Sequence, residues 1–556
     1  MNTPTFERAL RARASRRLAL RGAAVGLGGV FGLSLAGTPT RSYAWQTAPD
    51  GTPEATPVPE LPLTARASAQ FGAYPFQLGV ASGDPQANGV VLWTRLAPSP
   101  IDGGGMDPIP YELTWEVASD EAFTTIVQTG TAVADPFLAH SVHAEITGLE
   151  PAREYFYRFI VGDEVSQIGR TKTAPAMGQA VDQIRFGFAS CSNYEHGYFA
   201  AYRDMAAQNL DLIFHVGDYI YEYGPDEYLV RDDTNIRQVT GGEMVTLQNY
   251  RNRFALYRTD LDLQAAHLSA PWIVTWDDHE VENNWAADIS ENDDPVNSFL
   301  ARRADAFQAY YEHMPLRPSS MPVGPDLQLY RHLNYGDLLD ITVLDTRQYR
   351  SDQPSGDGAF PRSPASIDPN TTLTGPEQER WLLQTLDQSS AVWNVIAQQI
   401  MMAETYFPVA EGEAQTYYND SWSGYPNARA RILQHIATNQ TANPVVLTGD
   451  IHTSWANDLL LDWEDVAADP IATEYVCTSI TAGGMTPSDF GSAYKEVFPY
   501  IKFFDGRNGG YSTVTLTPEL LTTEFRLVEN MEDANSTVSP LATFTTDAGK
   551  PGANPA

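Results

Sequence analysis

The stretch Leu212-Ile-Phe-His-Val-Gly-Asp-Tyr-Ile-Tyr-Glu222 joins a short, mostly apolar run to a turn that carries acidic and phenolic side chains. The run Leu212–Val216 does not alternate between apolar and polar residues, which is typical of a strand buried on both faces. Similar runs recur with helical segments between them, at Ile184–Ala189, Trp272–Trp276, Leu338–Leu344, Val395–Gln399 and Val445–Thr448. We therefore expect residues 182–530 to form one α/β domain.

Four of these runs end in residues that can bind metals or catalyse reactions. The residues concerned are Cys191 after the first strand, Asp218 and Tyr221 after the second, Asp277, Asp278 and His279 after the third, and Asp450 and His452 after the last. In α/β sheets, ligands and catalysts gather at the carboxyl ends of the strands. The sequence therefore predicts that these side chains meet at one edge of the structure.

Acidic side chains dominate this predicted site. The segment Asp277-Asp-His-Glu-Val-Glu282 alone carries four carboxyl groups, and these motifs contain no Lys or Arg. Bound cations would remove the repulsion, and mixed oxygen, nitrogen and sulfur donors indicate one transition metal beside one or more hard cations. Two metals about 3.5–4 Å apart can bind a phosphoryl oxygen, generate hydroxide and stabilise the leaving oxygen. The pattern favours a metal-dependent phosphoester hydrolase.

The remainder of the chain divides by its residue patterns. Residues 71–175 contain short alternating runs separated by turns, which predicts a small β-sandwich. Residues 45–70 are largely Pro, Thr, Ala and Glu and are expected to form a linker. The Ala-, Thr-, Pro- and Gly-rich residues 531–556 are interpreted as a flexible tail.

The first residues have the pattern of an export signal. Ser15-Arg-Arg-Leu-Ala-Leu-Arg21 precedes an apolar run, and a small-x-Ala cleavage pattern follows at Ser42-Tyr-Ala44. We interpret residues 1–44 as a twin-arginine-type signal peptide, which makes the twin-arginine export machinery an expected partner. An ordinary secretory signal with an incidental Arg-Arg pair is the alternative. Both predict a secreted, periplasmic or cell-surface protein.

Charge and cysteine content exclude several other classes of protein. The 556-residue chain has a formal net charge of −35, with 35 Lys and Arg against 70 Asp and Glu. Such a surface repels nucleic acids and anionic membranes, so neither is an expected partner. No apolar run after the signal is long enough for stable membrane insertion. The two cysteines, Cys191 and Cys477, allow at most one disulfide bridge.

Five segments together carry a family resemblance. They are Phe188-Ala-Ser-Cys-Ser-Asn193, His215-Val-Gly-Asp-Tyr-Ile-Tyr-Glu222, Trp276-Asp-Asp-His-Glu-Val-Glu-Asn-Asn-Trp285, Leu344-Asp-Thr-Arg-Gln-Tyr-Arg350 and Thr448-Gly-Asp-Ile-His-Thr-Ser-Trp455. In order and content they resemble the motifs of PhoD-type alkaline phosphatases/phosphodiesterases. The resemblance covers nearly the whole chain after the signal peptide.

The resemblance implies a four-layer α/β/β/α metallophosphoesterase core behind a fibronectin III-like β-sandwich. It also implies Fe³⁺ and Ca²⁺ as cofactors. By motif position, Cys191, Asp218, Tyr221 and His452 are expected to bind iron. Asp218 is expected to bridge to calcium, with Asp278 and Asp450 as further calcium ligands. His279 is expected to lie near the leaving group and to donate a proton to it, while metal-activated hydroxide or oxide attacks phosphorus in line.

The resemblance thus implies a secreted alkaline phosphatase acting on phosphomonoesters and phosphodiesters. One alternative is a phospholipase D-like phosphodiesterase on the same scaffold. A second is a surface module that binds calcium structurally, although Cys191 and His452 are not donors that a calcium-only site needs. Taken singly, Cys191 could be a buried hydrophobe, Tyr221 a packing residue and His279 a structural imidazole. His215 and Cys477 are interpreted as core residues.

Overall fold

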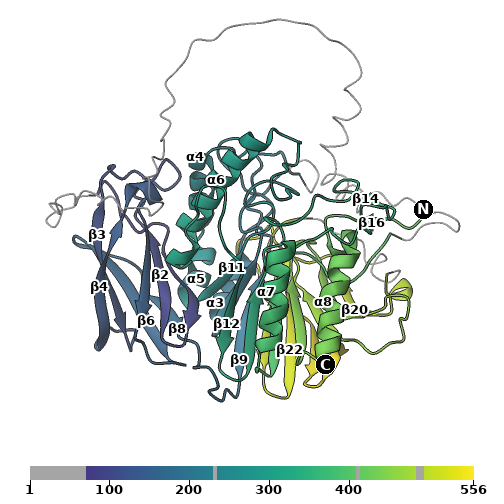
Figure 1. Ribbon diagram of the computed structural model, residues 1–556. Helices are drawn as coiled ribbons and strands as arrows, with labels where there is room; N and C mark the ends of the chain where they lie inside the picture. Colours follow the sequence, from purple (N-terminus) through teal and green to yellow (C-terminus); the bar gives the residue numbers. More distant parts are fainter. Residues whose placement is uncertain (1–70, 230–234, 408–413, 484–493) are drawn as a thin grey trace, which may run out of the picture.

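The computed structural model describes residues 71–229, 235–407, 414–483 and 494–556 (Figure 1). The expected signal peptide at 1–44 and the expected linker at 45–70 lie outside the described residues. No helix within the described ranges is both long and apolar enough to cross a membrane.

Two large sheets form the centre of the molecule (Figure 1). The first has ten strands, in the order β24 (Lys550–Pro555), β23 (Val538–Asp547), β22 (Leu520–Val528), β21 (Gly510–Leu516), β9 (Ile184–Ala189), β10 (Leu212–Val216), β11 (Trp272–Thr275), β1 (Val80–Gln86), β2 (Gly89–Arg95) and β5 (Ser141–Thr147). The second has seven strands, in the order β12 (Arg331–Tyr335), β13 (Leu339–Val343), β15 (Trp393–Ala397), β17 (Pro444–Thr448), β19 (Ala472–Val476), β18 (Ser454–Leu459) and β20 (Ile501–Asp505).

Helices cover the outer faces of both sheets. One buried cluster joins the ten-stranded sheet to α3 (Ala200–Ala207), α4 (Leu247–Arg258), α5 (Leu261–Ser269) and α6 (Val296–His313). Another joins the seven-stranded sheet to α7 (Gly375–Gln388) and α8 (Pro426–Asn439). A third cluster, including Phe186, Phe214, Val395 and Val445, fills the space between the sheets. The predicted four-layer α/β/β/α core is confirmed.

Parallel pairing brings the functional ends of the central strands together. In β9, β10 and β11, Phe214 pairs with Phe188 on one side and Ile273 on the other. Strands β13, β15, β17 and β19 are likewise parallel neighbours. Because parallel strands in register end at the same edge, the residues that follow them are delivered to a common region.

The N-terminal β-sandwich shares a sheet with the core. Its second sheet contains β4 (Ile126–Ala134), β3 (Tyr111–Ala118), β6 (Glu154–Val161) and β7 (Glu164–Val165), with β8 (Gly169–Lys172) paired to β6. Its other face is β1, β2 and β5, and β1 joins the core sheet through parallel pairing of Gly83 with Trp272. The Tyr155 hydroxyl accepts a 3.0 Å hydrogen bond from the Glu150 N–H, which ties the turn before β6 to that strand.

Residues 531–556 are not a flexible tail. They form β23 and β24, which extend the ten-stranded sheet beyond β22. The Phe544 ring packs 5.3 Å from that of Phe503, and the Thr546 hydroxyl lies 2.9 Å from that of Tyr475. The prediction was wrong because it relied on Ala, Thr, Pro and Gly content. Thr is β-branched and suits a half-buried strand.

The remaining elements are short. Strands β14 (Ala359–Phe360) and β16 (Tyr417–Tyr418) pair with each other near the core. Three 3₁₀ turns are η1 (Pro136–Leu138), η2 (Pro318–Ser320) and η3 (Trp422–Gly424). Most of residues 351–370 is irregular, in agreement with the turn-rich composition of that segment.

Candidate metal centre

The predicted site residues sit on sharply turned backbone where strands end. Cys191, Asp218, Asp450 and His452 all have left-handed conformations, with φ of 62°, 55°, 61° and 60°. Residues other than glycine adopt this conformation uncommonly, and such positions cluster at functional sites. These turns direct four side chains with donor atoms into the interior, where all four residues are buried.

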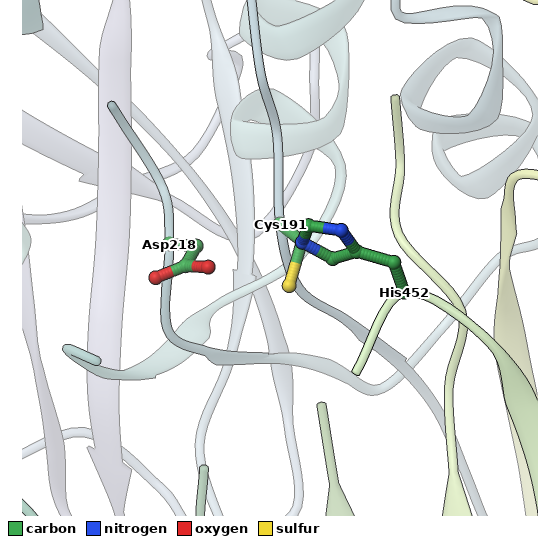
Figure 2. A group of neighbouring side chains, drawn as sticks. All are labelled: Cys191, Asp218 and His452. Atoms are coloured by element: carbon green, nitrogen blue, oxygen red, sulfur yellow. The ribbon is translucent and has the colours of Figure 1, made fainter. Parts of the chain in front are cut away.

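Cys191, Asp218 and His452 form one group of donor atoms. Their ligand atoms all lie within 4.8 Å of one another, and Figure 2 shows the side chains coming from three separate chain segments. The Tyr221 hydroxyl joins them, because it donates a 3.1 Å hydrogen bond to Asp218 Oδ2 and lies 3.1 Å from His452 Nε2. The structure therefore brings together all four residues that were expected to bind iron.

A second group of donors consists of carboxylates. Asp277, Asp278 and Asp450 have oxygens within 4.8 Å of one another, and Asp218, Asp278 and His279 form a further set with the same spacing. Asp218 therefore belongs both to the group with Cys191 and His452 and to the group with Asp278 and His279. Asp218 is thus the residue through which these two groups adjoin.

The electrostatics of this region fit bound cations. Burial raises the pKa of Asp218 well above its usual value, and the charges of Asp278 and Asp277 raise it further. Burial and the charge of Asp218 also raise the pKa of the Cys191 thiol. Metal ligands must be deprotonated, and a cation supplies the charge that holds buried groups in that form. The donors fit a transition metal at the Cys191 group and a hard cation at the carboxylate group.

Glu222 holds the His279 ring beside Asp218 and Asp278. Its Nδ1 lies 2.7 Å from Glu222 Oε2, and Glu222 Oε1 accepts a 2.8 Å hydrogen bond from the Asn283 N–H. Burial lowers the pKa of His279, but the charges of Glu222, Asp278 and Asp218 outweigh burial and raise it well above its usual value. The contact with Glu222 leaves Nε2 as the ring nitrogen that can serve a substrate.

Arg347 is a site residue that the sequence analysis missed. It is fully buried, and its guanidinium contacts Asp277 at 2.5 Å, Asp420 at 2.8 Å and Asp278 at 3.8 Å. The acidic segment contains no Lys or Arg of its own, but Arg347 provides a positive charge beside it. Arg347 follows β13, so the same argument from strand ends could have found it. Arg350 adds a second pairing to Asp420 at 3.0 Å.

Glu280 and Asn284, which follow β11, form hydrogen bonds that hold the turns carrying Asp218 and Asp278. Glu280 accepts hydrogen bonds from the N–H groups of Asp218 at 3.1 Å, Tyr219 at 2.5 Å and Asp277 at 2.9 Å. Burial raises the pKa of Glu280 to about 7. The Asn284 N–H donates to Asp278 Oδ2 at 2.8 Å, so Asn284 orients a carboxylate of the acidic group.

The remaining sequence expectations concern core residues. His215 is buried beside Trp272, with burial lowering its pKa to about 3. Cys477 and Cys191 are both buried free thiols, so the one bridge that the sequence allowed is not formed. The Ser190 hydroxyl lies near both sulfurs, at 3.5 Å from Cys477 and 3.2 Å from Cys191.

The fold and site define the class of protein. A four-layer sandwich with buried acidic, imidazole and thiol groups at its strand ends is the architecture expected for a metallophosphoesterase. The family model for the PhoD-like phosphatase matches residues 186–525, and the model for the N-terminal domain of the same family matches residues 63–175. The chain belongs to the PhoD-like phosphatase family, and it is a phosphoric ester hydrolase.

Two relatives show how far the similarity extends. Alkaline phosphatase D of Bacillus subtilis (strain 168) is 51% identical over 481 residues, which cover 86% of this chain and 82% of the relative. A solved structure of PhoD matches with a TM-score of 0.85 at 50% identity, over 88% of this chain and 93% of that one. The similarity therefore includes both the N-terminal sandwich and the catalytic core.

Proposed function

We propose that this chain is a secreted alkaline phosphatase that hydrolyses phosphomonoesters, and also phosphodiesters, with Fe³⁺ and Ca²⁺ as cofactors. The observation that carries the proposal is the position of Asp218, which groups with Cys191 and His452 and also with Asp278 and His279. Asp278 in turn groups with Asp277 and Asp450. Cys191, Tyr221 and His452 would hold iron with Asp218, and Asp278 and Asp450 would hold calcium with it. The thiol, phenol and imidazole suit a transition metal, whereas calcium prefers oxygen ligands.

The chain's own residues account for the remaining steps. When bound, the metals offset the charge of the phosphoryl oxygens and lower the pKa of water at the site. Asp218 and Asp278 would contribute carboxylates to the cations, and Arg347 pairs with Asp277 and Asp278. His279, oriented by Glu222, donates a proton to the oxygen of the departing alcohol. Water adds to phosphorus, the P–O bond breaks, and an alcohol and phosphate are released.

We expect His279→Gln to lower kcat by about 10²–10⁴-fold on alkyl phosphates, because an alkoxide leaves poorly without a proton. The effect on p-nitrophenyl phosphate should be much smaller, because p-nitrophenolate leaves without help. Steady-state kinetics on both substrates, with metal content measured in parallel, check this expectation. An equal loss on both esters, or a loss of bound metal, would show that His279 supports the site in some other way.

Substrate range tests the proposed ester class. We expect turnover of p-nitrophenyl phosphate and bis(p-nitrophenyl) phosphate, and little release of head group from phosphatidylcholine vesicles. Membership of the PhoD-like phosphatase family supports activity on the phosphomonoester. Preferential hydrolysis of the phospholipid would instead support the phospholipase D-like alternative. Membership of a phosphatase family argues against a calcium-binding surface module.

The proposed export route rests on the paired Arg16 and Arg17 in the first 44 residues. We expect R16K/R17K to leave the protein inside the cell, because twin-arginine export reads the arginine pair. Immunoblots of cell and medium fractions, with the wild-type chain alongside, measure the effect. Unchanged export of the double variant would favour an ordinary secretory signal.

A further inference from the structure

A pocket with aromatic walls lies directly beside the proposed metal centre. Asp450, one of the proposed calcium ligands, forms part of its lining. Aromatic side chains form most of the rest: Tyr406, Phe407, Tyr418, Trp455 and Tyr494. Tyr406 and Phe407 follow β15, Tyr418 ends β16, and Trp455 lies at the start of β18. Asp450 follows β17 and is the residue that the pocket shares with the metal centre.

The lining chemistry selects for an apolar group. Thr405 and Ser421 supply hydroxyls and Asp450 a carboxyl group, while none of the described lining residues is Lys, Arg or His. A second phosphate group entering here would meet Asp450 without a compensating cation from these side chains. An apolar group instead gains contact with ring faces and leaves no polar atom without a partner.

One wall of the pocket is fixed and another is accessible. The enclosed volume is about 30 Å³, so it holds part of a substituent while the rest of the group extends out of the pocket. Trp455 is buried, and its ring is held 4.5 Å from Phe504, so the inner wall is fixed. Tyr406 and Phe407 are half-buried, which makes them the accessible part of the wall.

We propose that this pocket binds the organic substituent of the phosphate ester, and that it favours apolar substituents over charged ones. The proposal rests on the proposed function, because Asp450 must adjoin the reacting phosphorus. For a monoester, the group in the pocket is the alcohol that leaves. For a diester, it is one of the two substituents. The substrates selected are therefore aryl, benzyl and alkyl phosphates rather than nucleoside polyphosphates.

Benzyl phosphate and glycerol 1-phosphate test this preference in the metal-loaded enzyme, because both release primary alcohols but differ in polarity. We expect wild-type kcat/KM to favour benzyl phosphate by about tenfold or more, the effect of one or two methylene-sized contacts in an apolar pocket. Phe407→Ala and Tyr406→Ala should each remove most of this preference, mainly by raising KM for benzyl phosphate. Phe407→Leu should retain much of it.

Phe137→Ala is the matched control, because Phe137 is an exposed ring on η1 in the N-terminal sandwich. It should leave the ratio of the two kcat/KM values unchanged. A wild-type ratio near one, or equal losses on both esters in the pocket variants, would overturn the pocket assignment while leaving the phosphatase proposal intact. Failure of the metal-loaded wild-type enzyme to hydrolyse either ester would instead overturn the proposed function, and this inference with it.

Discussion

Asp218→Asn should lower kcat/KM for p-nitrophenyl phosphate by about 10³-fold or more, a much larger loss than His279→Gln should cause on this substrate. Loss of bridged cations removes several kcal/mol of transition-state stabilisation, and each 1.36 kcal/mol corresponds to about tenfold in rate. Asp218 is the residue that belongs to both the Cys191 group and an acidic group, so its loss affects two cation sites together. The substitution preserves size and removes only the charge.

Element analysis accompanies the kinetics, because the expected cause is a loss of bound metal. Asp163→Asn is the matched control, since Asp163 is an exposed aspartate in the N-terminal sandwich. That variant should retain wild-type activity and metal content. The metal-free Asp218→Asn protein should be no less stable than metal-free wild type, because one repelling charge has been removed from a buried acidic group. Wild-type turnover in Asp218→Asn would contradict the proposed bridging role.

Arg347→Met should lower the free energy of unfolding by about 3–5 kcal/mol, the typical cost of leaving a buried charge without its partner. Arg347 is fully buried and pairs with Asp277, Asp420 and Asp278. These neighbouring charges raise its pKa well above the usual value despite the opposing effect of burial. Methionine fills much of the volume but supplies no charge, so Asp277 would remain buried without compensation and Asp420 would keep only Arg350.

Chemical denaturation with excess metal in every sample measures this loss. Arg431→Met is the control, because Arg431 pairs with Glu379 at 2.6 Å near the surface, and its side chain is 37% exposed. That change should cost at most about 1 kcal/mol. Adding Asp277→Asn to Arg347→Met should recover part of the lost stability, because the carboxylate that lost its arginine partner is then neutral. Equal costs for the two arginine variants would show that the buried pairing contributes little.

The fold was predictable from the sequence where burial leaves a local pattern. Ile184–Ala189 and Leu212–Val216 have the predicted bounds, because strands buried on both faces need continuous apolar residues. The pairing of β1 with β11 was not predictable in this way, since it joins residues distant in sequence. Strands β23 and β24 were missed because Ala, Thr, Pro and Gly content obscured their alternation.

The candidate site was predictable to the extent that strand ends mark it. Cys191, Asp218 and Asp450 were predicted from their positions after strands and from the family resemblance. In the structure, Cys191 and Asp218 lie in one donor group and Asp450 in an adjoining carboxylate group. Arg347 was not predicted as a site residue, although it also follows a strand. Its ion pair with Asp277 joins the seven-stranded sheet to the ten-stranded sheet. Contacts between sheets depend on packing, which a single sequence does not display.

Hydrolysis of p-nitrophenyl phosphate at alkaline pH, before and after chelation and again after calcium is restored, shows whether activity depends on the proposed metals. We expect chelation to abolish activity, calcium to restore it, and element analysis to find iron in the active protein. Calcium should fail to restore activity in Asp218→Asn measured alongside. Full activity in protein freed of both metals, or metal-loaded protein that hydrolyses neither monoesters nor diesters, would contradict the proposed iron and calcium phosphatase.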